Sequence, residues 1–300
     1  MGKLLIDAHS HLWWKQDTVV DGSPIHSLDS NPSRSLFFGE EVQMLPPFMI
    51  DGHNTAEVFL SNIDYAQVAG AVVVQEVIDG NQNDYLREVQ SRYPDRFFCM
   101  GMVERLELND KSSETLRDFK GIAVPGHRLK FSLLDSIPFF KKMEEEGKVL
   151  SMCLGESARQ IGEMGEVIQE CPKLKVAIGH FGMVTTPAFE SQVKLALQGD
   201  NVMIESGGIT WLYNSEFYPY PSAVRSIRQA ADWVGMDRLM WGSDYPRTIT
   251  AITYKMSYDF ILKTDELTDE EKAMFLGQNA QRFYGFKNLP SLPYIKNMSE

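Results

Sequence analysis

Short runs of consecutive apolar residues alternate with longer amphipathic stretches along most of this chain. In the longer stretches, apolar residues recur every three to four positions, as is typical of helices. The short runs are apolar throughout, which indicates strands that are buried on both faces of a parallel sheet. The expected strands are 4–6, 71–75, 97–103, 121–124, 149–153, 175–179, 202–205 and 238–241.

Helices are expected between these strands. The amphipathic segments cover 55–68, 83–92, 113–120, 137–146, 158–170, 188–197 and 223–234. Eight strands in alternation with helices predict a fold of the α/β class, a closed (β/α)8 TIM barrel. A chain of 300 residues can form one such barrel, so we expect a single domain over 1–300.

Two segments depart from the alternation. The stretch 12–52 is polar and aromatic and contains four prolines, so it predicts a long loop after the first strand that reaches the active site. The tail 267–285 predicts a C-terminal helix, because Thr268 and Glu271 have capping-box spacing and Gly285 follows as a stop signal. We expect Asn279 and Arg282 to anchor this helix to the barrel.

Two histidines follow the first strand directly. In an extended chain His9 and His11 point to the same side, with Cα atoms roughly 6.5 Å apart. Imidazole is the side chain most used for metal ligation and proton transfer, so we interpret the pair as functional and not as a chance ending of the strand.

Polar residues also end the other expected strands. Catalytic groups of such barrels lie at the carboxyl ends of the strands. We therefore expect His180, after the sixth strand, and Asp244, after the eighth, to converge with His9 and His11, although an isolated Asp in such a turn is more often a cap. The remaining polar residues at strand ends are Gln75, Glu76, Glu104, Cys153 and Glu205.

The sequence around these residues resembles the amidohydrolase superfamily, specifically its amidohydrolase-related (amidohydrolase 2) branch. The matching stretches are 6–11, 83–86, 93–97, 179–182, 237–246 and 277–285. This resemblance implies a distorted barrel in which His9, His11 and Asp244 surround a divalent metal ion, usually zinc. It also implies that His180 faces the substrate and that Asp244 is the general base or relays a proton. Similar members include lactonases, decarboxylases and hydratases of small carboxylated molecules.

The chain departs from this family pattern at the end of the fifth strand. Cys153 stands where metal-dependent relatives of the decarboxylase type carry a histidine. A cysteine there is either a further zinc ligand or a small buried apolar residue. Some lactonases of the branch work without metal, so a site with Zn²⁺ or another divalent ion and a metal-free site both stay open. Glu76 and Glu104 are candidates for a further carboxylate ligand or, alternatively, partners of basic residues.

Cations near the barrel mouth are candidates for binding a carboxylated substrate. Arg128 and Lys130 follow the fourth strand, and Arg247 follows Asp244 closely. A planar guanidinium binds a carboxylate through two hydrogen bonds. Trp211 belongs to an aromatic segment after the seventh strand, which predicts either a wall of the substrate pocket or the packing of a long loop.

Charge and composition narrow the class of partner. A net charge of −12 without a basic tract argues against nucleic acid, and no apolar run approaches the roughly 18 residues of a membrane span. Three cysteines without a CxxC pair argue against a disulfide framework and, with no leader segment expected, favour the cytoplasm. The expected partner is a small-molecule substrate, and the resemblance suggests a homodimer.

The leading hypothesis is a hydrolase of a small carboxylated or sugar-acid lactone or ester. Asp244 would activate water, while His180 and a nearby cation hold the oxyanion or the acid group. One alternative is a metal-dependent decarboxylase or hydratase of a small unsaturated carboxylic acid. The other is a barrel that binds a ligand without catalysis.

Overall fold

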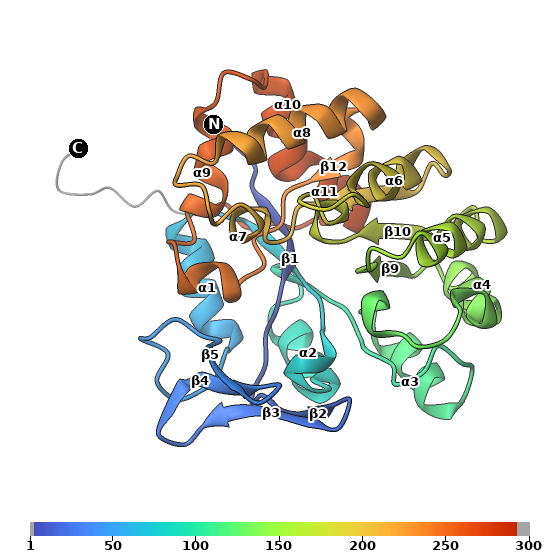
Figure 1. Cartoon of the computed structure of the whole chain (residues 1–300), viewed down its shortest axis with the longest axis horizontal. Helices are drawn as coiled ribbons and strands as arrows, with labels where there is room; N and C mark the ends of the chain where they lie inside the picture. The colour runs from blue at the N-terminus through green and yellow to red at the C-terminus, as the bar shows by residue number, and fades with distance from the viewer. Residues whose placement is uncertain (1–2, 293–300) are drawn as a thin grey trace.

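The computed structural model describes residues 3–292 (Figure 1). Within these residues, parallel strands form a three-stranded sheet in the order β1-β6-β7 and a five-stranded sheet in the order β8-β9-β10-β11-β12. The eight strands are β1 (Ile6–Ser10), β6 (Gly70–Val73), β7 (Phe97–Cys99), β8 (Gly121–Val124), β9 (Val149–Met152), β10 (Lys175–Ile178), β11 (Val202–Glu205) and β12 (Leu239–Met240).

Backbone contacts join the two sheets at both seams. Gly101, just after β7, pairs with Ile122 of β8, and Ser10 of β1 pairs with Tyr245. The amide of Ala8 donates to the carbonyl of Trp241 over 2.9 Å, on the same seam as Ser10. The strands therefore surround a common axis, and the predicted TIM-barrel architecture is confirmed.

Helices surround these strands, as Figure 1 shows. Helix α8 illustrates why they form, since its buried residues Ala223, Ile227, Ala230 and Val234 recur every three to four positions and face the barrel. The α-helices are α1 (Ala56–Tyr65), α2 (Asn83–Arg92), α3 (Asp110–Asp118), α4 (Ile137–Glu145), α5 (Ala158–Glu170), α6 (Phe189–Val193), α7 (Ile209–Leu212), α8 (Pro221–Val234), α9 (Met256–Lys263), α10 (Asp269–Ala273) and α11 (Asn279–Tyr284).

The C-terminal helix forms with the predicted signals. Thr268 and Glu271 make both bonds of a capping box, and Gly285 ends α11 at a φ of 76°. A π-helical turn, Met274–Gln278, joins α10 to α11. The side chain of Asn279 donates to the carbonyls of Met236 and Leu239, which confirms it as an anchor. Arg282 donates to the carbonyl of Asp237 and has the same role.

Side chains of the strands fill the barrel. Alternate strand residues such as Ile6, Ala8 and Val72 form one buried cluster, and Phe283 and Tyr284 of α11 complete it. The opposite, carboxyl end of the strands is therefore where a cavity can form.

The segment 12–52 is not the long loop that the sequence analysis predicts. It contains an antiparallel sheet of four strands, β2 (Asp17–Val20), β3 (Ser23–Leu28), β4 (Asn31–Phe37) and β5 (Glu40–Gln43), at the lower edge of Figure 1. Asp21 and Gly22, both with positive φ, form the first tight turn, which is a known hairpin signal. Val20 and Ile25 pack against Ile78, so the sheet is attached beside the barrel mouth.

Several short 3-10 helices follow the strands. The ones that bear on the site are η1 (Val77–Asp79), η2 (Gly126–Arg128), η4 (His180–Gly182) and η7 (Arg247–Thr250). Among residues 3–292, no helix combines the length and the apolar character that crossing a lipid bilayer requires.

Candidate active site

A cavity of about 430 Å³ lies at the carboxyl ends of the strands. His9 and His11 line it from β1 and the residue after it, His180 from η4, and Asp244 from the turn after β12. The four side chains are thus brought together from segments up to 235 positions apart in the sequence, as expected for catalytic groups of such a barrel.

Three of these side chains form a compact group of potential metal ligands. The two Nε2 atoms of His9 and His11 are 3.1 Å apart. Asp244 Oδ1 lies 3.0 Å from His11 Nε2 and 3.7 Å from His9 Nε2. Nitrogen and oxygen ligands about 2.0–2.1 Å from a tetrahedral zinc ion are about 3.3 Å from one another. The spacing of the three atoms therefore fits a tetrahedral metal ion with an open fourth position.

A carboxylate lies near the far nitrogen of each histidine. His9 Nδ1 lies 2.7 Å from Glu205 Oε1, and because a carboxylate only accepts, Nδ1 carries a proton. Asp79 Oδ2 lies 3.4 Å from His11 Nδ1, and among the described residues neither of these buried atoms has a hydrogen bond. A His ligand that binds through Nε2 holds its proton on Nδ1 and donates it to such a carboxylate. Both imidazoles could therefore hold a metal ion through Nε2.

Glu205 is fixed by more than His9. Its oxygens also accept hydrogen bonds from the backbone amides of Gly207 at 2.6 Å and His180 at 3.2 Å. A Cβ atom at Gly207 would lie 2.7 Å from His9 Cγ, so only glycine allows the backbone to approach the imidazole this closely. Glu205 ends β11, but the sequence analysis assigns it no role, because its partner is 196 residues away.

The charges of the site favour a cation. Burial opposes protonation of His9, but the contact with Glu205 and the charge of Asp244 outweigh it and raise the pKa of His9 to about 9. Burial also opposes ionisation of Asp244, yet His11 and Arg247 hold the pKa of Asp244 well below its ordinary value. Burial lowers the pKa values of His11 and His180, so both rings are neutral at pH 7. The negative charges of Glu205 and Asp244 would therefore be offset by a divalent ion bound beside them.

The buried carboxylate of Asp7 ties the ends of β1 and β12 together. It accepts hydrogen bonds from the backbone amide of Ser243 at 2.8 Å, from the amide of His9 at 3.1 Å and from Tyr254 Oη at 2.7 Å. Asp244 follows Ser243 in the chain and has a φ of 59°, an unusual conformation for a residue other than glycine. Asp7 therefore helps to hold the histidine pair and Asp244 in register.

Two of the four predicted substrate-binding residues line the cavity. Arg247 donates from one terminal nitrogen to Asp79 Oδ1 over 2.6 Å, and its other terminal nitrogen lies 3.9 Å from Asp244 Oδ1. Trp211 of α7 donates from its indole Nε1 to Asp244 Oδ2 over 2.6 Å. Trp211 therefore contacts the candidate base itself.

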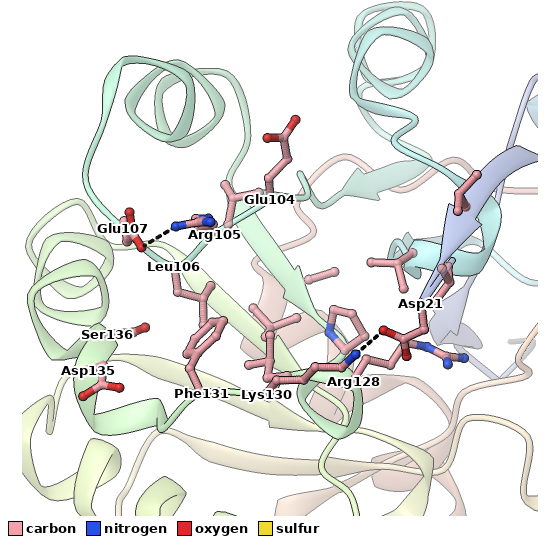
Figure 2. Close-up of a pocket in the computed structure, with 18 residues that line it drawn as sticks. Asp21, Glu104, Arg105, Leu106, Glu107, Arg128, Lys130, Phe131, Asp135 and Ser136 are labelled. Atoms are coloured by element: carbon pink, nitrogen blue, oxygen red, sulfur yellow. Dashed lines mark hydrogen bonds and ion pairs between the residues drawn. The ribbon is translucent and has the colours of Figure 1, made fainter. Parts of the chain in front are cut away.

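Arg128 and Lys130 face a second, neighbouring cavity of about 650 Å³ (Figure 2). Arg128 Nε lies 2.9 Å from Glu76 Oε1, and Glu76 lines the first cavity. Lys130 is three-quarters exposed and pairs with Asp21 of the antiparallel sheet, so it does not reach the histidine pair. Neither Arg128 nor Lys130 lines the cavity of the histidine pair, so the expectation that these two residues share that pocket is wrong.

The remaining candidate ligands lie outside the metal group. Glu76 is a partner of Arg128, and exposed Glu104 pairs with Lys111 over 3.7 Å. Cys153 lines the cavity, but it is not part of the His9, His11 and Asp244 group, and burial raises the pKa of its thiol.

Solved structures share the fold. A probable 2-pyrone-4,6-dicarboxylic acid hydrolase from Acinetobacter baumannii superposes with a TM-score of 0.67 at 20% identity, covering 94% of this chain and 99% of that one. An amidohydrolase from Burkholderia multivorans with bound zinc gives 0.67 at 17% identity, covering 96% and 100%. A 5-carboxyvanillate decarboxylase from Novosphingobium aromaticivorans, complexed with manganese, gives 0.62 at 16% identity, covering 95% and 96%.

Sequence comparison identifies the family. Among curated proteins, no sequence matches this chain. The family model described as amidohydrolase matches residues 6–286, which include every strand of the barrel and all three residues of the metal group. This chain therefore belongs to the amidohydrolase family.

Proposed function

We propose that this amidohydrolase hydrolyses a lactone or ester of a small carboxylated compound. One observation carries the proposal. Asp244 presents Oδ1 to His9 and His11 in a cavity of about 430 Å³ that Arg247 also lines. The site thus combines a fixed carboxylate base with a cation for an acidic substrate.

We also propose that His9, His11 and Asp244 hold a divalent ion, with zinc and manganese as the leading candidates. The spacing of the three ligand atoms and the carboxylates behind the imidazoles support it. Such an ion would lower the pKa of water and polarise the substrate carbonyl.

Asp244 takes the proton in the proposed reaction. It accepts a proton from water while the water oxygen forms a bond to the carbonyl carbon. Asp244 then returns the proton to the leaving alkoxide as the carbon–oxygen bond of the lactone or ester breaks. Its lowered pKa keeps the carboxylate ionised at pH 7, which is the form that a general base requires.

His180 and Arg247 divide the remaining tasks. His180 Nδ1 lies 2.9 Å from the carbonyl oxygen of Gly207, and because a carbonyl only accepts, Nδ1 carries the proton of the neutral ring. Nε2 of His180 is therefore an acceptor, suited to orient water or a substrate hydroxyl. Arg247 therefore takes the role of holding an anion, because its second terminal nitrogen can donate to a substrate carboxylate.

Decarboxylation of a small carboxylic acid is the second candidate. The ligand group formed by His9, His11 and Asp244 favours it, because a metal-dependent lyase would use the same ion. The likeness to a manganese-bound decarboxylase also favours this second candidate. The proposed partner in either case is a small molecule, while a homodimer and a cytoplasmic location remain predictions.

A substrate panel with metal-free and metal-restored protein tests the proposal. The panel contains sugar-acid lactones, carboxylated pyrones, matched methyl esters and carboxylated phenols. Ring opening or ester cleavage supports the hydrolase, and release of carbon dioxide from the phenols supports the lyase instead. No turnover of any compound with Zn²⁺ or Mn²⁺ would overturn both and favour a binding protein.

A further inference from the structure

Trp211 contacts the carboxylate oxygen of Asp244 that does not contact His9 or His11. Its indole Nε1 donates to Asp244 Oδ2 over 2.6 Å, whereas His11 Nε2 is 3.0 Å from Oδ1. Among residues 3–292, no other hydrogen bond reaches Oδ2. The indole also lies edge-on to the His180 ring, with the ring centroids 5.9 Å apart.

The fold makes room for this contact at one glycine. Gly208 has a φ of 71°, and a Cβ atom there would lie only 1.8 Å from Trp211 Nε1. Any other residue at this position would push the indole away. The indole N–H therefore reaches Asp244 because the backbone before α7 carries no side chain.

We infer that Trp211 is a positioning residue for Asp244, a role that rests on the proposed function of this site. A carboxylate can rotate about its Cβ–Cγ bond, and rotation would turn Oδ1 away from His9 and His11. The indole N–H fixes Oδ2 and so keeps Oδ1 in the ligand group. Groups that orient metal ligands contribute strongly to metal affinity.

The variant Trp211→Phe removes the N–H and keeps an aromatic ring. We expect the Kd for Zn²⁺, measured by competition with a chromophoric chelator, to rise about 10- to 100-fold. Trp14→Phe is the matched control, because Trp14 is exposed and stacks on His53. Its Kd should stay within about twofold of the wild-type value, since Trp14 lies outside the cavity.

Two further readouts separate positioning from a general structural role. In kinetics, Trp211→Phe should lower kcat, with KM nearly unchanged. In fluorescence, Zn²⁺ should change the wild-type tryptophan emission, because charge beside the Trp211 ring changes, and this response should be lost in Trp211→Phe. Thermal unfolding of each variant shows whether it is folded.

Gly208→Ala gives a second route if Trp211→Phe does not fold. It keeps the tryptophan but displaces the indole, so it should weaken Zn²⁺ binding in the same way. A Kd within twofold of wild type in both folded variants would overturn the role of Trp211. Zn²⁺ affinity is measured without substrate, so the two proposals can fail separately. If the variants bind Zn²⁺ more weakly but the wild-type protein opens no lactone, the proposed hydrolysis is wrong and the positioning role of Trp211 is supported.

Discussion

Glu205 Oε1 lies 2.7 Å from His9 Nδ1 and joins two residues that are 196 positions apart in the sequence. The carboxylate ends β11 and the histidine lies in β1, on the far side of β12. This contact fixes the imidazole so that Nε2 faces His11 and Asp244. Carboxylates orient metal-binding histidines in this way, so the contact supports His9 as a metal ligand.

Glu205→Gln tests this contact. Glutamine keeps the size of the side chain but removes its negative charge. Its NH₂ group would also lie near the backbone N–H groups of His180 and Gly207, which donate to Glu205 in the wild type. We expect Zn²⁺ affinity to fall about 10- to 100-fold. Competition with a chelator measures the affinity, with Glu216→Gln as the control, because Glu216 does not line the cavity. Equal affinity in both variants would contradict the supporting role.

Asp244→Asn tests the base. The substitution keeps the shape of the side chain and removes its ability to accept a proton. We expect kcat on the best substrate of the panel to fall about 10²- to 10⁴-fold, as is typical when a general base is lost. The assay is run at saturating metal, with circular dichroism to verify folding. Turnover within a few-fold of wild type would rule out the role.

Arg247→Lys tests recognition of an acidic substrate. Lysine keeps the charge but loses the planar fork of the guanidinium. Because hydrogen bonds to charged groups contribute about 1.5–3 kcal/mol, KM for a carboxylated substrate should rise about tenfold or more, and less for its methyl ester. Lys130→Ala is the control, since Lys130 faces the second cavity. A larger effect from Lys130→Ala than from Arg247→Lys would reverse the assignment.

Glu76 predicts a specific dependence of stability on pH. Burial alone would raise its pKa, but His127 and Arg128 outweigh burial and lower the pKa of Glu76 from 4.5 to about 2. The pKa of Glu76 is thus lower in the folded protein than in the unfolded chain. The contacts of Glu76 with His127 and Arg128 therefore stabilise the protein above pH 4.5, and this contribution disappears as the pH falls from 4.5 to 2. A shift of this size corresponds to about 3 kcal/mol at neutral pH.

Urea unfolding at pH 7 and at pH 3 measures this effect. Glu76→Gln should lower the free energy of unfolding at pH 7 and lose less stability than wild type on going to pH 3. Glu104→Gln, an exposed glutamate paired with Lys111, should behave like wild type. If Glu76→Gln and wild type lose the same stability on acidification, the ion pair does not act as described.

The barrel and the central site could be predicted from the sequence because their signals are local. Uninterrupted apolar runs mark the strands, and the two histidines and Asp244 follow such runs directly. The carboxyl ends of parallel strands meet at one end of a barrel, so the convergence follows from the topology. The capping signals at Thr268 and Gly285 are equally local.

The rest depends on contacts that only the folded chain creates. The segment 12–52 predicts a loop because it is polar and contains four prolines, yet its strands pair with one another and several of their residues stay exposed. Lys130 follows β8 closely in the sequence, but its side chain pairs with Asp21, beside the same sheet. Glu205 and Asp79 could not be matched to their histidines without the barrel.

The central claim is that His9, His11 and Asp244 bind a divalent ion. Calorimetric titration of metal-free protein with Zn²⁺ tests it most directly, because metal binding is measured without knowledge of the substrate. We predict binding of one ion per chain in wild type and in His26→Ala, a histidine of the antiparallel sheet. The double variant His9→Ala, His11→Ala should show no such binding while remaining folded. Absence of binding in wild type, or unchanged binding in the double variant, would contradict the account.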